Sequence, residues 1–185
     1  VVTRVGTFTL ASNLVLTIAT VFFLVRNRWA HLTLAGLVAS YGGFAFWRFF
    51  HDGHWLLGAT QEHLWLALAF LAGYWLCFTA ATFLAEGDTL ADRRRAAFLS
   101  ANNGAFFALA MLSMAAQRSG HLWEFCLGFG AMLLGLAALA QARLPQEPAT
   151  RAAYVTQGLV LLTVGLILKF TGHQLAALLA AGASA

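Results

Sequence analysis

Residues 63–85 read HLWLALAFLAGYWLCFTAATFLA and hold no aspartate, glutamate, lysine or arginine. An α-helix needs about 20 consecutive apolar residues to cross the hydrocarbon core of a bilayer, which is roughly 30 Å thick. The run is apolar almost throughout and lacks the alternation of apolar and polar residues that is typical of a membrane β-strand. This stretch therefore predicts a transmembrane helix, and it decides the fold class of the chain.

The composition of the whole chain agrees with this prediction. Of the 185 residues, 61% are hydrophobic and 10% are charged, whereas soluble domains average roughly 45–50% and 25%. So few charges cannot cover the surface of a soluble fold, and the high hydrophobicity excludes a disordered chain. The net charge of +4 comes from basic residues that flank apolar runs. We therefore assign this charge to membrane topology and expect no nucleic-acid partner.

Similar apolar runs elsewhere predict an all-α, polytopic transmembrane bundle that forms a single domain over residues 1–185. The six expected spans are 5–25, 30–50, 63–85, 96–116, 121–142 and 152–171. Residues 174–185 form a further apolar segment that is too short to span, so we expect a truncated seventh span or a re-entrant segment. This short segment and the first residue, Val1, favour a fragment of a longer chain.

The lysines and arginines predict the orientation of these spans. One side of the expected bundle carries seven of the 11 basic residues, namely Arg26, Arg28, Arg93, Arg94, Arg95, Arg143 and Arg151. The other side carries Arg4, Arg48, Arg118 and Lys169. Because cytoplasmic loops are enriched in basic residues, we expect a multi-pass protein of the bacterial inner membrane with its N-terminus outside. The run Asp92–Arg95 is then a cytoplasmic flank that contacts anionic lipid.

Histidines gather at the outer ends of the expected spans and form a candidate metal site. They are His51, His54, His63, His121 and His173, and Asp52, Glu62 and Glu124 accompany them. Neutral imidazole is a common ligand of transition metals, and a zinc enzyme needs about three protein ligands. The sequence contains no HExxH motif, however, and histidine is also tolerated at a membrane interface. Three interpretations of these histidines therefore stay open. They bind no cofactor and lie at the membrane interface, they bind a transition metal, or they bind a haem.

Polar side chains inside the expected spans form a second candidate site. Asn102 and Asn103 lie in the fourth span, and Gln157 lies at a similar depth in the sixth. They predict a hydrogen bond between these two helices, and a polar pathway for a substrate is the alternative. Asn13 lies near the middle of the first span. No acidic or basic residue is expected at mid-membrane, which argues against an ion-driven pump.

Small residues predict where helices approach each other closely. In the second span, Ala35, Ala39 and Gly43 recur at every fourth position, beside Gly36 and Ser40. The fourth span has the same spacing, with Ala97, Ala101 and Ala105. Trp75 is the only tryptophan that we expect deep in the membrane, because the others lie near the ends of spans.

Four short stretches carry a resemblance to a known family: NNGAFFALA at 102–110, LLGLA at 133–137, YVTQGL at 154–159 and LKFTGHQ at 168–174. They resemble a bacterial family of very large polytopic membrane proteins that is classified as a domain of unknown function. The resemblance covers mainly residues 95–185. It implies that the chain is one piece of a longer array of helices, and it supplies no catalytic residues.

Together these patterns favour a non-enzymatic membrane module that binds, transports or senses a ligand within a larger polytopic protein. Its expected partners are the lipid bilayer and further transmembrane helices of the same or another chain. One alternative is a membrane enzyme with a histidine-lined transition-metal site at the outer face. A second alternative is a haem- or pigment-binding subunit of an electron-transfer complex.

Overall fold

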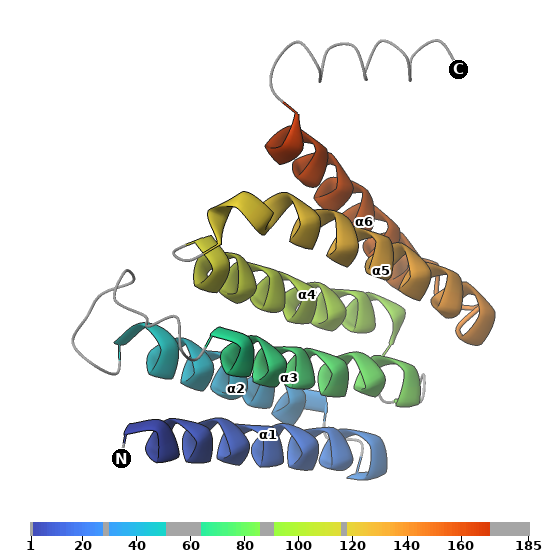
Figure 1. Ribbon diagram of the computed structural model, residues 1–185. Helices are drawn as coiled ribbons and strands as arrows, with labels where there is room; N and C mark the ends of the chain where they lie inside the picture. Colours follow the sequence, from blue (N-terminus) through green and yellow to red (C-terminus); the bar gives the residue numbers. More distant parts are fainter. Residues whose placement is uncertain (1, 28–29, 51–63, 86–90, 116–117, 171–185) are drawn as a thin grey trace. The chain divides into compact units, whose positions relative to one another are not determined.

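The computed structural model describes residues 2–27, 30–50, 64–85, 91–115 and 118–170, and it is helical without any strand in these ranges. The helices are α1 (Val2–Asn27), α2 (Ala30–Phe50), α3 (Leu64–Leu84), α4 (Asp92–Ala115), the 3-10 helix η2 (Ser119–His121), α5 (Leu122–Arg143) and α6 (Pro148–Lys169). Figure 1 shows them in chain order. The predicted all-α class is confirmed.

Within the described residues, five helical segments are long and apolar enough to cross a membrane: Thr7–Arg26, Leu64–Leu84, Asp92–Ala115, Ser119–Arg143 and Pro148–Lys169. The chain thus has the helices of a multi-pass membrane protein. The count of six spans is not confirmed, because α2 is not among these segments, and a span at α2 stays a prediction. The expected short segment 174–185 lies outside the described residues.

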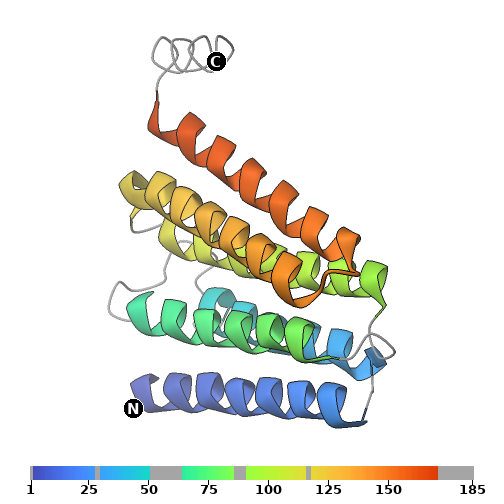
Figure 2. The same cartoon turned by 90° about the vertical axis from the view of Figure 1, so that its right-hand side faces the viewer.

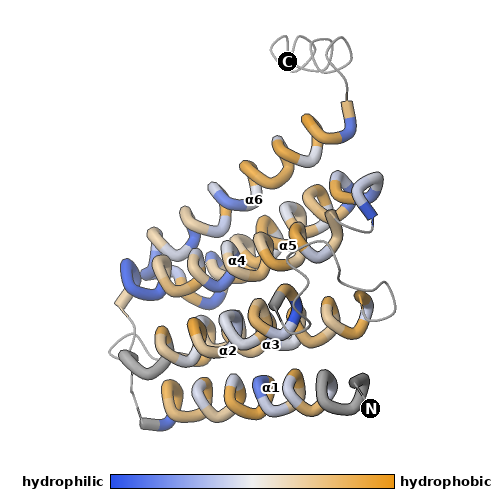
Figure 3. Tube along the Cα trace, turned by 90° about the vertical axis from the view of Figure 1, so that its left-hand side faces the viewer, coloured by the Kyte–Doolittle hydropathy of each residue, from blue (hydrophilic) through white to orange (hydrophobic). Residues whose placement is uncertain are grey.

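The surfaces of these helices are apolar along much of their length. Figure 3 shows hydrophobic residues along the helices, with the most hydrophilic residues gathered mainly near the helix ends. Large side chains such as Phe8 (74% exposed), Phe46 (65%) and Trp65 (66%) lie uncovered. Soluble proteins rarely expose wide apolar patches, whereas lipid solvates such side chains without cost. The exposed surface is therefore consistent with contact with membrane lipid.

The chain divides into two compact units, and the single domain expected over residues 1–185 stays a prediction. Unit 1 is Val1–Gln117 and contains α1 to α4. Unit 2 is Arg118–Ala185 and contains η2, α5 and α6. In unit 1, α1 packs against α2 and α3, while α4 packs against α3 and α2.

Small residues of α2 bring it close to α1. A Cβ atom placed on Gly36 would lie 2.4 Å from the Cγ2 atom of Thr20, so no larger residue fits there without movement. One turn further along α2, the Ser40 hydroxyl hydrogen-bonds with the Thr17 hydroxyl at 2.7 Å, and both side chains are buried. Close backbone approach and a hydroxyl pair therefore join the two helices.

The predicted small-residue stripes are only partly correct. Ala35 and Ala39 are exposed, because α2 turns the neighbouring Gly36 and Ser40 toward α1 instead. On α4, Ala97 and Ala101 are also exposed. The buried face of α4 carries larger side chains, namely Phe98, Leu99, Asn102, Asn103 and Phe106. The buried face is decided by two kinds of side chain: polar groups, which need partners, and aromatic rings, which have large contact areas. Small residue size alone therefore did not predict the buried face.

In unit 2, α5 and α6 form a close pair around glycines. A Cβ atom on Gly130 would lie 2.9 Å from the Gly158 carbonyl oxygen, and a Cβ atom on Gly165 would lie 2.8 Å from Leu127 Cδ2. Figure 2 shows the two helices running side by side. α6 begins at Pro148, four residues before the expected start, because proline fits the first turn of a helix, where its missing N–H is not needed.

Candidate functional site

Buried polar side chains meet in the interior of unit 1, where α2, α3 and α4 pack together. We call this group the polar cluster, and it consists of Tyr41, Trp75, Thr79, Asn102 and Asn103. All five are buried. Two of them, Asn102 and Asn103, are predicted site residues. The structure thus places this predicted pair at a junction of three helices.

Asn102 is the centre of the polar cluster. Its side-chain oxygen accepts a hydrogen bond from the Tyr41 hydroxyl at 2.6 Å. Its side-chain nitrogen donates to the Thr79 hydroxyl oxygen at 3.1 Å and to the Trp75 carbonyl oxygen at 3.2 Å. One carboxamide on α4 therefore holds both α2 and α3, and both of its donors and its oxygen are paired. Since lipid and protein interior offer no water as an alternative partner, these bonds fix the register of the three helices.

Asn103 makes the second link between α3 and α4. Its side-chain oxygen accepts a hydrogen bond from the indole nitrogen of Trp75 at 2.8 Å. The Trp75 ring also packs against Phe106, with 5.5 Å between ring centroids. A buried indole N–H needs a partner of this kind, which explains why an amide faces the ring.

Aromatic rings surround the polar cluster and connect it to α1. Tyr41 packs against Phe78 at 6.1 Å and edge-on against Tyr74 at 6.5 Å between centroids. The Tyr74 hydroxyl donates to the Leu10 carbonyl oxygen of α1 at 2.8 Å. The chain of contacts thus runs through all four helices of unit 1.

Asn13, another predicted polar residue, lies elsewhere in unit 1. A Cβ atom on Gly43 would lie 2.7 Å from the Nδ2 atom of Asn13, so this amide packs directly against α2. Asn13 therefore belongs to the α1–α2 contact, and its side chain also interacts with Tyr74 of α3.

Arg95 differs from its expected role as a cytoplasmic flank. α4 already begins at Asp92, so the run is part of the helix. Arg93 and Arg94 are exposed as expected, but Arg95 is completely buried, and its Nη1 atom donates to the Thr82 carbonyl oxygen in the last turn of α3. Carbonyl groups in the last turn of a helix lack partners within that helix, and basic side chains often bind them.

The predicted histidine site is described only at His121. His51, His54, His63 and His173 lie outside the described residues. The His121 side chain is 56% exposed, and its Nδ1 atom lies 3.2 Å from the Glu124 Oε1 atom, one turn along the chain. Within the described ranges, no group of three or more potential metal ligands occurs. The metal and haem hypotheses stay untested.

Gln157 is half-buried on α6 of unit 2. The partners of Asn102 and Asn103 given above lie in unit 1, and a bond from either residue to Gln157 stays a prediction. Tyr41, Trp75 and Thr79 were not predicted as site residues. The importance of their polar groups shows only in the structure: the Tyr41 hydroxyl and the Trp75 indole donate to amide oxygens on α4, and the Thr79 hydroxyl accepts from the Asn102 amide.

The chemistry available in the polar cluster is hydrogen bonding. Carboxamide, phenol, indole and hydroxyl groups do not titrate near neutral pH, and the cluster includes no carboxylate, imidazole or thiol. Its side chains bind one another within the junction of the helices. The arrangement is suited to fixing helices and provides no nucleophile with a neighbouring base.

Comparison with known proteins gives no relative: no family model, no curated protein and no solved structure matches this chain.

Proposed function

We propose that the chain is a non-catalytic membrane module that supports binding, transport or sensing within a larger polytopic protein. The observation that carries this proposal is the polar cluster, in which the carboxamide of Asn102 joins α2, α3 and α4 through three hydrogen bonds. A core of this kind keeps helices in one register and so gives neighbouring segments a rigid support. The family resemblance to long helical arrays is part of the same proposal.

The exposed faces support a role beside other helices. On α4, Ala97 and Ala101 lie exposed at a spacing of four residues, which permits close approach of another helix. Exposed Phe8 and Phe46, on α1 and α2, suit contact with lipid. The proposed partners are therefore lipid and further transmembrane helices.

The decisive experiment for the non-catalytic role compares two reconstituted proteins. Purified protein in lipid nanodiscs is incubated with lipid and glycan substrates, beside a variant in which His51, His54, His63, His121 and His173 are all glutamine. We expect no turnover by either protein. Turnover by the original protein that the variant loses would contradict the proposal.

The same preparation tests the metal alternative. Elemental analysis is expected to find less than about one tenth of an equivalent of any transition metal per chain, whereas an occupied site holds about one. An absorption spectrum of the same sample is expected to lack a haem band. A stoichiometric metal or a haem band would favour one of the alternative functions.

The proposed orientation, with the N-terminus outside the inner membrane, is tested by labelling single cysteines. Gly120 and Gln146 are exposed at opposite ends of α5, in the connections before and after this helix. In a chain with Cys77 and Cys126 replaced by alanine, we expect Gly120→Cys to react with an impermeant reagent in intact cells. Gln146→Cys is expected to react only after lysis. The reverse pattern would invert the orientation.

A further inference from the structure

Two buried polar side chains lie at the end of unit 1 where α2 and α4 finish. Arg48 is in the last turn of α2 and is 8% exposed. Ser113 is in the last turn of α4 and is 0% exposed. α2 and α4 contact each other, and Figure 1 shows them finishing at the same end. The fold therefore brings these two polar groups to one region of unit 1.

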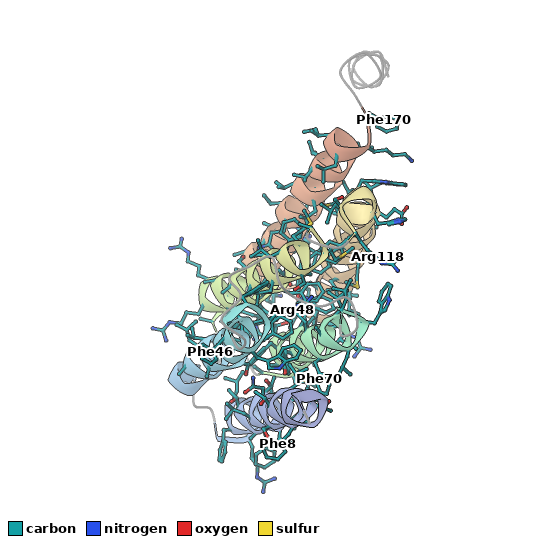
Figure 4. The ribbon with its side chains drawn as sticks, turned by 60° about the vertical axis from the view of Figure 1, so that its left-hand side comes forward. Phe8, Phe46, Arg48, Phe70, Arg118 and Phe170 are labelled. Carbon is teal, nitrogen blue, oxygen red and sulfur yellow. The ribbon has the colours of Figure 1, made fainter. Side chains whose placement is uncertain are left out.

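Neither side chain is fully paired in the described part of the chain. The Nε and Nη2 atoms of Arg48 and the Oγ atom of Ser113 are buried and have no hydrogen-bond partner there. Figure 4 shows Arg48 among the helices of unit 1, whereas Phe46 of the same helix lies on the outside. Most buried polar groups in folded proteins have a partner, so two exceptions at one end of two neighbouring helices require an explanation.

The unpaired atoms of Arg48 suit an oxyanion. The Nε–H and one N–H of Nη2 are parallel along one edge of the planar guanidinium. This edge matches two oxygen atoms of a phosphate or carboxylate and forms two short, charge-assisted hydrogen bonds. The Ser113 hydroxyl adds a further donor. The chain thus supplies the hydrogen-bond donors that bidentate binding of an anion needs.

The energetics also favour an anion at this place. An arginine that stays charged among membrane helices is costly unless it is paired, and such residues usually mark a binding site or pathway. Basic pockets between transmembrane helices bind the headgroups of anionic lipids. The end of a membrane helix lies near the headgroup level, and the flexible stem of Arg48 lets its guanidinium move toward that level.

We propose that Arg48 and Ser113 form a binding site for the phosphate group of an anionic lipid. The guanidinium edge of Arg48 holds two phosphate oxygens, and the Ser113 hydroxyl donates to the same group. A lipid is favoured over free phosphate because headgroups are concentrated at the helix ends. This inference rests on the proposed membrane location of unit 1.

The test is lipid-dependent stability of the full chain in neutral detergent micelles. Phosphatidylglycerol is expected to raise the temperature of thermal unfolding in a saturable way, and phosphatidylcholine is expected to have a much smaller effect. Arg48→Gln is expected to weaken lipid binding, so that the half-saturating phosphatidylglycerol concentration rises about tenfold or more. This is the range for a lost charge-assisted hydrogen bond. Arg26→Gln, which changes an exposed arginine of α1 in the same unit, is expected to leave that concentration unchanged.

Two further variants keep the test informative if Arg48→Gln fails to fold. Arg48→Lys retains the charge but cannot present two parallel N–H groups, so weaker binding is expected. Ser113→Ala is expected to weaken binding by a few-fold, as for loss of one neutral hydrogen bond. Unchanged binding in Arg48→Lys would contradict the bidentate geometry, and unchanged binding in Ser113→Ala would contradict a site shared by α2 and α4.

Three other results would overturn the proposal. Inorganic phosphate that stabilises the protein as much as phosphatidylglycerol would assign the site to the free anion. A response that appears only in Asp52→Asn, Glu62→Gln protein would show that a carboxylate of the chain already pairs with Arg48. Equal responses to both lipids would show that no anionic headgroup is recognised. Release of the chain from membranes by an alkaline wash would instead contradict the proposed membrane module, so the two failures are distinguishable.

Discussion

The two units hold their helices together in different ways. In unit 1, Asn102 connects α4 to α2 and α3 through hydrogen bonds. In unit 2, α5 and α6 approach closely at Gly130 and Gly158, with backbone against backbone. Lipid provides no hydrophobic force between helices, so polar pairing and close packing must hold them together. Unit 1 uses both, with close packing where α1 meets α2 at Gly36, whereas the α5–α6 pair of unit 2 is built around its glycines. Polar pairing selects a partner and a register, whereas glycine contacts mainly determine how near two helices come.

The largest expected effect is in unit 2, for Gly130→Leu. A Cβ atom there would meet two backbone atoms, the Gly158 oxygen at 2.9 Å and the Leu162 nitrogen at 3.1 Å, which cannot turn away. The helices must separate, and we expect a loss of about 3 kcal/mol in the free energy of unfolding, the upper part of the range for overpacked sites. Unfolding in mixed micelles with increasing dodecyl sulfate, followed by circular dichroism, measures this loss.

Gly128→Leu is the matched control for that prediction. Gly128 has no atom within 4 Å of a Cβ position and is exposed on the same helix. A small effect is expected. Equal losses in the two variants would mean that the close contact at Gly130 does not hold α5 against α6.

A smaller loss is expected in unit 1, for Asn102→Ala. The change removes three hydrogen bonds, and at about 0.6 kcal/mol for each bond inside a membrane protein the loss is about 2 kcal/mol. The same unfolding measurement applies. Gly104→Ala, two residues away in open space, is the control. If Asn102→Ala were as stable as the control variant, the polar cluster would not stabilise unit 1.

The smallest expected effect is at the contact of α1 with α2, for Ser40→Ala. It removes one hydroxyl pair, the 2.7 Å bond with Thr17, and the expected loss is about 0.6 kcal/mol. Thr163→Ala on α6 removes only an exposed bond within one helix and is expected to have less effect. If Ser40→Ala lost as much stability as Asn102→Ala, the polar cluster would not stabilise unit 1 more than the α1–α2 contact does.

The sequence predicted the helices better than it predicted their contacts. Apolar runs gave the helix positions to within a few residues, because length and hydropathy are local properties. Asn102 and Asn103 stood out because amides are rare in such runs. The buried faces were harder to predict, since membrane helices are apolar on all sides and periodicity does not distinguish a lipid face from a protein face. Gly36 and Ser40 were therefore not separated from Ala35 and Ala39.

Two further features depended on the fold in three dimensions. Arg95 was assigned to a solvated flank with its neighbours because a run of charges does not reveal which member faces inward. Its role became visible only once α3 was seen to end beside it, with the Thr82 carbonyl oxygen within reach. The same holds for Tyr41 and Trp75. Their donor groups could be recognised as site groups only after the structure placed them opposite the amides of α4.

The central claim is that the polar cluster holds unit 1 in register, and a double-mutant cycle between Tyr41→Phe and Asn102→Ala tests it most directly. The hydroxyl of Tyr41 and the side-chain oxygen of Asn102 are 2.6 Å apart. The free energies of unfolding of the original protein, both single variants and the double variant give their coupling energy. A second cycle between Tyr41→Phe and Leu112→Ala, an exposed change on α4, is expected to be additive. We predict a coupling of about 0.6 kcal/mol between Tyr41 and Asn102, the average for a hydrogen bond between membrane helices. Additive losses in both cycles would contradict the claim.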